Sequence, residues 1–157
     1  MCKHHEEYMR KAIGLSRQSM NSAGGPFGAV IVKDGRIIGE GMNRVTVDND
    51  PSAHAEVVAI RQACKTVDDY SLKGAVIYSS CEPCPMCLSA IYWARLDAVY
   101  FGNTQDDAAK IDFDDAFLYE QVSLPHESRS IPIKPLLGDE AVSVFEEWAN
   151  KDDKTQY

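Results

Sequence analysis

Two short groups of metal-binding residue types lie thirty positions apart in the sequence. His54 is followed two positions later by Glu56, and Cys84 is followed three positions later by Cys87. One imidazole and two thiolates leave the fourth position of a tetrahedral zinc ion open, which is the pattern of catalytic zinc sites. His54, Cys84 and Cys87 therefore predict a catalytic centre that holds one Zn²⁺ per chain and activates a water molecule.

The roles of these side chains follow from their expected positions at the starts of two helices. Cys84 and Cys87 have the spacing of residues on one helix face, and a helix N-terminus lowers the pKa of nearby thiols. His54 and Glu56 would diverge in mid-helix, but at a helix start both can face a site beyond the helix end. We expect Glu56 to be the catalytic acid and base, which takes a proton from the activated water and delivers it to the substrate.

The other cysteines are expected to be structural. Cys81 extends the spacing to C-x-x-C-x-x-C, but the fourth cysteine followed by proline of a ferredoxin-type motif is missing. Cys64 falls late in an expected helix, and Cys2 lies near the N-terminus. An odd count of five cysteines without a secretion signal argues against a disulfide framework.

The elements that carry the two groups can be predicted from apolar periodicity and turn residues. Asp34-Gly35, between two apolar runs, predicts a β-hairpin. Asp50-Pro51-Ser52 offers an N-cap for a helix that runs to about Lys65, and Pro85 fits the first turn of another helix. Helices are expected over about 5–22, 53–65, 84–94, 104–110, 114–121 and 138–150, and strands over 27–32, 37–40, 75–78 and 97–101.

This order of elements predicts an α/β fold, namely a three-layer α/β/α sandwich with a mixed central sheet. A chain of 157 residues fits one domain over 1–157, and no interdomain linker is visible. No apolar run approaches the ~20 residues of a membrane span, and the N-terminal residues form no hydrophobic signal region, so we expect a cytoplasmic protein with no membrane partner. The net charge of −8 also argues against a nucleic-acid partner.

The H-x-E…P-C-x-x-C pattern resembles the signature of zinc-dependent nucleobase deaminases. Over essentially its full length the chain is similar to the bacterial-type guanine deaminases of the small cytidine-deaminase-fold class. The similarity is carried by segments 24–35, 49–56 and 80–94. Phe113-Asp114-Asp115 and the terminal Tyr157 are its more discriminating features.

The resemblance implies hydrolysis of guanine to xanthine and ammonia, with a purine base as the partner. It implies that Asn43 contacts the base and that Asp115 accepts hydrogen bonds from the ring N–H and the amino group. A carboxylate suits two adjacent donors, although a pair of Asp residues also fits a solvated helix start. The other substrate contacts that the resemblance implies are Phe27, Ala55, Trp93 and Tyr157.

The resemblance also implies a homodimer in which the segment from about 120 to 157 is exchanged between chains. Tyr157 of each chain would then close the active site of its partner. Without the resemblance, the polar end of the chain would be interpreted as a disordered tail.

Three other functions share parts of these motifs. A tRNA adenosine deaminase has the same zinc motif but needs clustered Lys and Arg for phosphates, whereas the region after Gly102 is rich in Asp and Glu. Deaminases of guanosine, cytosine or a guanine-like triazine share the site and stay open, although a ribose needs more room. A non-catalytic zinc-binding module would leave Glu56 without a role.

Overall fold

The structure is a computed structural model that describes residues 3–113 and 115–157. It divides into two compact units, Met1–Leu118 and Tyr119–Tyr157. The expectations about Cys2 and Asp114 lie outside the described residues, and the single-domain organisation stays a prediction. Within the described part of the chain, no helix combines the length and apolarity that a membrane span requires.

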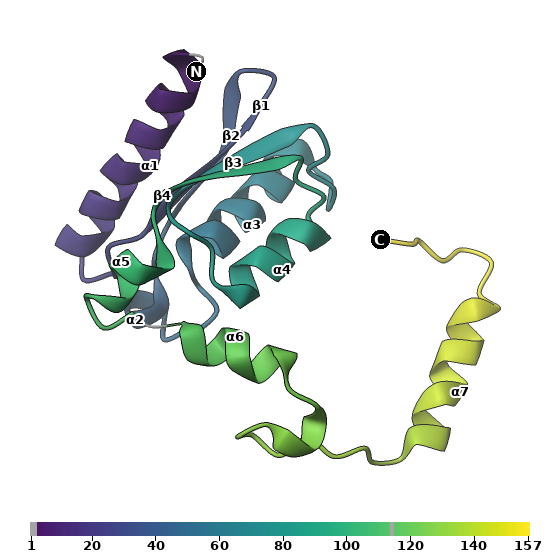
Figure 1. Cartoon of the computed structure of the whole chain (residues 1–157). Coiled ribbons are helices and arrows are strands. Elements are labelled where there is room, and N and C mark those ends of the chain that lie inside the picture. Colours follow the sequence, from purple (N-terminus) through teal and green to yellow (C-terminus); the bar gives the residue numbers. More distant parts are fainter. Residues whose placement is uncertain (1–2, 114) are drawn as a thin grey trace. The chain divides into compact units, whose positions relative to one another are not determined.

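The first unit is built on a mixed sheet in the order β2-β1-β3-β4 (Figure 1). β1 is antiparallel to both of its neighbours, and β3 is parallel to β4. The strands are β1 Gly28–Lys33, β2 Arg36–Met42, β3 Ala75–Cys81 and β4 Ala98–Asn103. Each predicted strand is present, and the predicted α/β sandwich with a mixed sheet is confirmed.

The turn between β1 and β2 is the one that Asp34-Gly35 predicts. Asp34 has φ 50° and Gly35 has φ 73°, the left-handed conformation at both central positions of a tight hairpin turn. The register pairs Lys33 with Arg36 directly across it. The hairpin therefore has the two-residue loop that its sequence favours.

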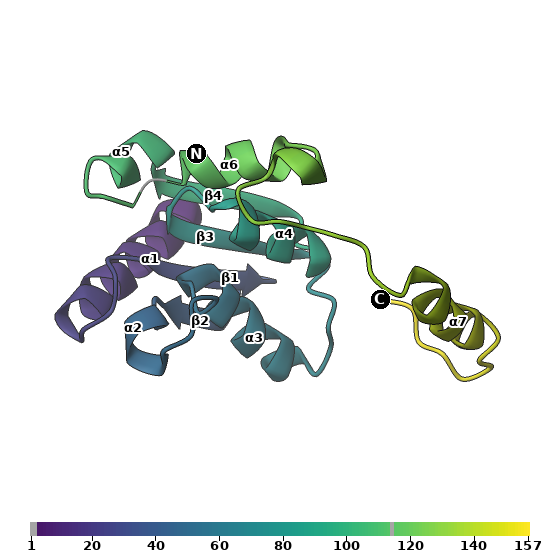
Figure 2. The ribbon, with the colours of Figure 1, turned by 90° about the horizontal axis from the view of Figure 1, so that it is seen from below.

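Helices cover both faces of the sheet (Figures 1 and 2). Alternate β1 residues point to opposite sides: Val30 and Val32 pack with α1 (Lys3–Asn21), whereas Ala29 and Ile31 pack with α3 (Ala55–Val67) and α4 (Pro85–Trp93). A period of two is what a strand buried on both faces requires. The cluster under α3 and α4 thus holds in place the two helices whose starts carry the metal-binding residue types.

The remaining α-helices follow the sequence prediction closely, and two short elements, α2 and a 3₁₀ helix, are additions. The short α2 (Val45–Asp48) was not predicted, because four residues carry no helical period. α5 (Gln105–Ala109) begins with a capping box formed by Thr104 and Asp107. The chain continues with α6 (Ala116–Ser123), the 3₁₀ helix η1 (His126–Ser128) and α7 (Gly138–Ala149).

The second unit exposes apolar side chains. No residue of α7 is buried, and four large apolar side chains of this helix are each at least 44% exposed. They are Val142, Val144, Phe145 and Trp148. This helix therefore has a largely exposed apolar surface.

Candidate active site

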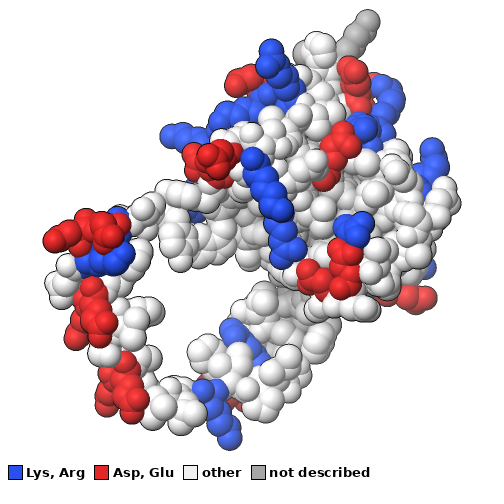
Figure 3. Space-filling model, turned by 180° about the vertical axis from the view of Figure 1, so that it is seen from behind, with Lys and Arg blue, Asp and Glu red and all other residues white. Residues whose placement is uncertain are grey.

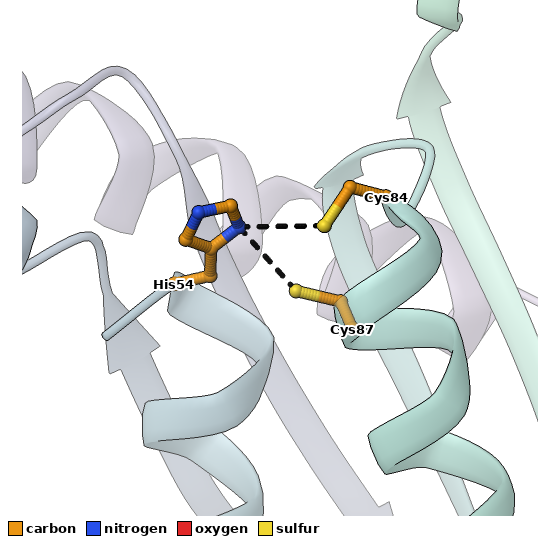
Figure 4. A group of neighbouring side chains, drawn as sticks. All are labelled: His54, Cys84 and Cys87. Carbon is orange, nitrogen blue, oxygen red and sulfur yellow. Dashed lines mark hydrogen bonds between the residues drawn. The ribbon is translucent and has the colours of Figure 1, made fainter. Parts of the chain in front are cut away.

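The site begins at the N-termini of α3 and α4. His54 is the N-cap residue of α3 and Cys84 that of α4; both have extended backbones, and neither side chain caps its helix. N-cap side chains usually accept a backbone N–H bond, but these two instead face each other across the site (Figure 4). Pro85 occupies the first turn of α4, as predicted.

The predicted N-cap of α3 within residues 50–52 is wrong. The Asp50 carboxylate accepts hydrogen bonds from the Ser52 backbone N–H at 2.8 Å and its hydroxyl at 2.6 Å, so it closes a local turn. Arg61 of α3 lies 3.5 Å from Asp50 and so connects this turn to the helix. Because the turn uses the Asp50 carboxylate, the helix starts later, with His54 at its cap.

The three expected metal ligands form one group. The His54 Nδ1 atom lies 3.6 Å from Cys84 Sγ and 3.5 Å from Cys87 Sγ (Figure 4), and all three ligand atoms lie within 4.8 Å of one another. Zinc bonds of about 2.0 Å to nitrogen and 2.3 Å to sulfur at a tetrahedral angle would place these atoms about 3.5 Å apart. The geometry of the three side chains therefore fits a zinc ion.

The two thiols have opposite pKa shifts. The pKa of Cys84 is lowered to about 4, first by its interaction with the Cys87 side chain and then by His54. The pKa of Cys87 is raised by its proximity to Cys84 and by burial. A bound metal ion would hold both cysteines as thiolates, because metal-binding cysteines are deprotonated.

Glu56 lies beside the metal group and is only 5% exposed. Its Oε1 accepts a hydrogen bond from the Ser79 hydroxyl at 3.0 Å, and its Oε2 lies 3.4 Å from Cys87 Sγ. Burial raises the pKa of this carboxyl. A carboxyl whose pKa is moved toward neutrality is suited to taking up and releasing protons.

A cavity of about 410 Å³ opens beside these residues. His54, Glu56 and Cys84 line it together with Asn43, Phe27 and Asp115, so the metal group and three of the expected substrate contacts share one space. The sequence analysis predicted no role in the site for several other residues that line the cavity. They include Gly25, Glu82, Asp112 and Leu118.

Asn43 presents a donor to this cavity. Its Oδ1 atom accepts from the backbone N–H groups of Gly25 and Val45, both at 3.3 Å. Because the amide oxygen is bound to the backbone, the NH₂ group is the part that Asn43 can offer to a ligand.

The rings of Phe27 and Phe113 pack edge to face, with 4.9 Å between their centroids, and both rings line the cavity.

Two expected substrate contacts do not line this cavity, and a third belongs to the second unit. Ala55 is fully buried in the core, and Trp93, the last residue of α4, is 63% exposed and lies beneath the Arg95 guanidinium. Tyr157 belongs to the second unit and is 75% exposed. The substrate roles of these three residues stay predictions.

Cys81 and Cys64 have no place in the metal group. Cys81 is the buried last residue of β3, as expected, and it also lines the cavity. Burial raises its pKa to about 11, so it is a neutral thiol. Cys64 lies on α3, and its Sγ is 3.8 Å from the Tyr70 carbonyl oxygen.

Comparison with known proteins gives matches over both the zinc region and the full length. The model of the cytidine and deoxycytidylate deaminase zinc-binding region matches residues 2–103. A guanine deaminase of Bacillus subtilis (strain 168) is 51% identical over 98% of this chain and 99% of its own. The X-ray structure of guanine deaminase from Bacillus subtilis, also 51% identical, has a TM-score of 0.95 and is matched over 98% of both chains.

A second group of relatives matches only part of the chain. A tRNA-specific adenosine deaminase of Haemophilus influenzae is 42% identical over 62% of this chain and 57% of its own length. The similarity to the guanine deaminase thus extends over nearly the whole chain, whereas the similarity to this tRNA enzyme covers less than two thirds of it.

Proposed function

Because this chain belongs to the family of zinc-dependent cytidine and deoxycytidylate deaminases, we propose that it is a guanine deaminase, which hydrolyses guanine to xanthine and ammonia. The observation that carries this proposal is the shared cavity. His54 and Cys84 of the metal group and the buried Glu56 carboxyl line it, and so do Asn43 and Asp115.

His54, Cys84 and Cys87 would hold the zinc ion. When bound there, zinc acts as a Lewis acid and lowers the pKa of a water molecule at its fourth position. The two helix N-termini contribute partial positive charge, which favours the thiolate forms of the cysteines.

Glu56 moves the protons of the reaction. The oxygen of water adds to the ring carbon that bears the amino group, and Glu56 accepts the proton that this water gives up. It delivers this proton to the adjacent ring nitrogen. Glu56 would then take the remaining hydroxyl proton of the adduct and pass it to the amine, so that the carbonyl forms as the C–N bond breaks and ammonia leaves. Glu56 is buried beside the metal ligands, which places its carboxyl within reach of the water and the base for these proton transfers.

The base is recognised by complementary donors and acceptors. Asp115 lines the cavity and would accept hydrogen bonds from the ring N–H and the amino group of guanine. The NH₂ group of Asn43 would donate to an acceptor on the base, since its oxygen is bound to Gly25 and Val45. Phe27 and Phe113 provide an apolar wall for the flat ring.

An RNA substrate fits the charges of this chain poorly. Asp112, Asp115 and Glu82 line the cavity, where a nucleic acid backbone would be repelled. On the face drawn in Figure 3, Lys and Arg are interspersed with Asp and Glu, whereas RNA binding calls for clustered positive charge.

A homodimer that exchanges residues 119–157 is part of the proposal. The second unit exposes the apolar side chains of α7, and Tyr100 and Phe101 of β4 are 40% and 45% exposed in the first unit. Exposed apolar surface of this kind marks places that another chain covers. In such a dimer Tyr157 would close the cavity of the partner. The cytoplasmic location stays a prediction.

The test is ammonia release by the zinc-loaded protein from guanine, guanosine, adenine, cytosine, cytidine, a guanine-like triazine and a tRNA anticodon loop. Guanine turnover far above the rest is the expected result. Preference for the RNA loop or for a nucleoside would reject guanine as the substrate, and inactivity on every compound would favour a non-catalytic zinc module.

A further inference from the structure

Ser79 occupies an unexpected place for a hydroxyl group. It lies on β3 and is 2% exposed. Ala29, the register partner of Ser79, and Ile77, two residues before it on the same sheet face, belong to the apolar core under α3 and α4. A buried hydroxyl on such a face is unfavourable unless it finds a hydrogen-bond partner. The Ser79 hydroxyl finds one in Glu56, to which it donates at 3.0 Å.

The two oxygens of Glu56 are turned to different sides. Oε1 accepts from Ser79, and Oε2 lies 3.4 Å from Cys87 Sγ, toward the metal group. Among the side chains that the structure describes, these two are the donors to the Glu56 carboxylate. Ser79 itself is not among the residues that line the cavity, so it stands behind Glu56 as seen from the substrate.

Metal binding leaves Ser79 as the remaining side-chain donor. Cys87 can bind zinc only as a thiolate, and a thiolate has no proton to give to Oε2. The bond from Ser79 to Oε1 is unaffected by this change. It would also survive when Oε2 carries a proton, because Oε1 accepts in both states.

We propose that Ser79 is a positioning residue, whose hydroxyl holds Oε1 of Glu56 so that Oε2 faces the metal and the reacting atoms. This inference rests on the proposed deaminase function and adds to it a residue that acts through Glu56 rather than on the substrate. A general base within hydrogen-bond reach of its proton is effective only when its orientation is maintained.

The first experiment removes the hydroxyl by Ser79→Ala and measures kcat, KM and zinc content. A hydrogen bond to a charged group corresponds to about a ten- to hundredfold change in rate, so kcat for guanine should fall by that factor. Zinc content and KM should stay near those of the unchanged protein. An unchanged kcat, or a loss of zinc, would contradict the proposal.

The second experiment separates the hydroxyl from the volume of the side chain. Ser79→Thr keeps the hydroxyl, whereas Ser79→Val has nearly the same shape without it, and both suit a β-strand. The Thr variant should be at least about tenfold faster than the Val variant. Equal rates of the two variants would show that the hydroxyl group does not position Glu56.

Two controls distinguish positioning from general damage. Ser80→Ala removes the neighbouring buried hydroxyl, which accepts from the Gly28 N–H and does not contact Glu56, so it should leave kcat nearly unchanged. In a Glu56→Gln background, Ser79→Ala should cause no further loss of the residual rate. An equal loss in both backgrounds would show that Ser79 is merely structural.

The unchanged protein in the same assay tests the proposed function separately. If it prefers another base to guanine, the rates of all variants are compared with that base as the substrate.

Discussion

At the scale of single residues, the site combines three side chains that suit zinc with one carboxyl that suits proton transfer. His54 Nδ1 lies about equally far from the two sulfurs, at 3.6 and 3.5 Å. Glu56 contacts Cys87 but does not belong to the group of metal-binding atoms. Metal binding and proton transfer are therefore assigned to different residues, and each can be changed without the other.

Glu56→Gln should separate these two tasks. The amide keeps the size of the side chain but cannot take up a proton, so guanine turnover should fall by roughly 10²–10⁴-fold. Zinc content, measured by elemental analysis of the purified protein, should stay near one ion per chain. Full turnover in a zinc-loaded Gln variant would remove Glu56 from the mechanism.

Asp115→Asn tests recognition of the base. The change replaces one acceptor oxygen by a donor that faces the donors of guanine, so kcat/KM for guanine should fall by about ten- to hundredfold. Zinc content should not change. Asp112→Asn is the matched control, because Asp112 lines the same cavity and Asn tolerates its left-handed φ of 67°. Equal effects of the two variants would assign the role to the general negative charge of the cavity.

At the scale of elements, the site depends on how closely α3 approaches β2. A Cβ atom at Gly41 would collide with the Ala55 carbonyl oxygen and lie 2.6 Å from the Ala59 backbone nitrogen. Both atoms belong to the first turns of the helix that begins after His54. The small residue in β2 thus sets the position of a metal ligand through the backbone of α3.

Gly41→Ala should therefore reduce both stability and zinc binding. Overpacking against a helix backbone costs about 1–3 kcal/mol, which denaturant unfolding measures directly. Gly14→Ala on α1 is the control, because its Cβ would meet no atom within 4 Å and Ala is favoured over Gly by up to about 1 kcal/mol in a helix. Equal stability of the Gly41→Ala variant and the unchanged protein would contradict the close contact of β2 with α3.

At the scale of the whole molecule, the chain combines a sandwich unit that holds the site with a C-terminal unit that exposes apolar side chains. The full-length similarity to guanine deaminases extends over both units, whereas the zinc-binding model ends at residue 103. We expect the catalytic chemistry to belong to the first unit and the second unit to contribute through association of two chains.

Deletion of Tyr157 should lower guanine turnover and leave zinc content and unfolding unchanged, because the residue is exposed within its own unit. If the tail closes the partner's cavity, dimers formed by co-expression of the deletion variant with Glu56→Gln should regain activity. In these mixed dimers, the active site of the deletion variant has its own Glu56 and is closed by Tyr157 of the Glu56→Gln chain. Co-expression of the deletion variant with a variant that has both changes is the control and should stay inactive. Full activity of the deletion variant alone would rule out a lid.

The sequence by itself determined the features that depend on local spacing. The i, i+3 cysteines, the proline in the first turn of α4 and the Asp34-Gly35 turn each involve residues close in the chain, whose geometry is set by backbone conformation. The zinc ligands and the role expected for Glu56 followed from these signals, as did the sandwich with its mixed sheet. The substrate contacts came from resemblance, and of these Phe27, Asn43 and Asp115 line the cavity.

Only the tertiary structure decided which side chains share the site. The contact of Ser79 with Glu56 joins a strand to a helix 23 residues away, and no local pattern reports which way a buried serine points. For the same reason Asp112 and Glu82 appear in the cavity lining, while Ala55 and Trp93 do not. Side-chain direction and the packing distance between elements depend on all the elements together, so they become visible only once the chain has folded.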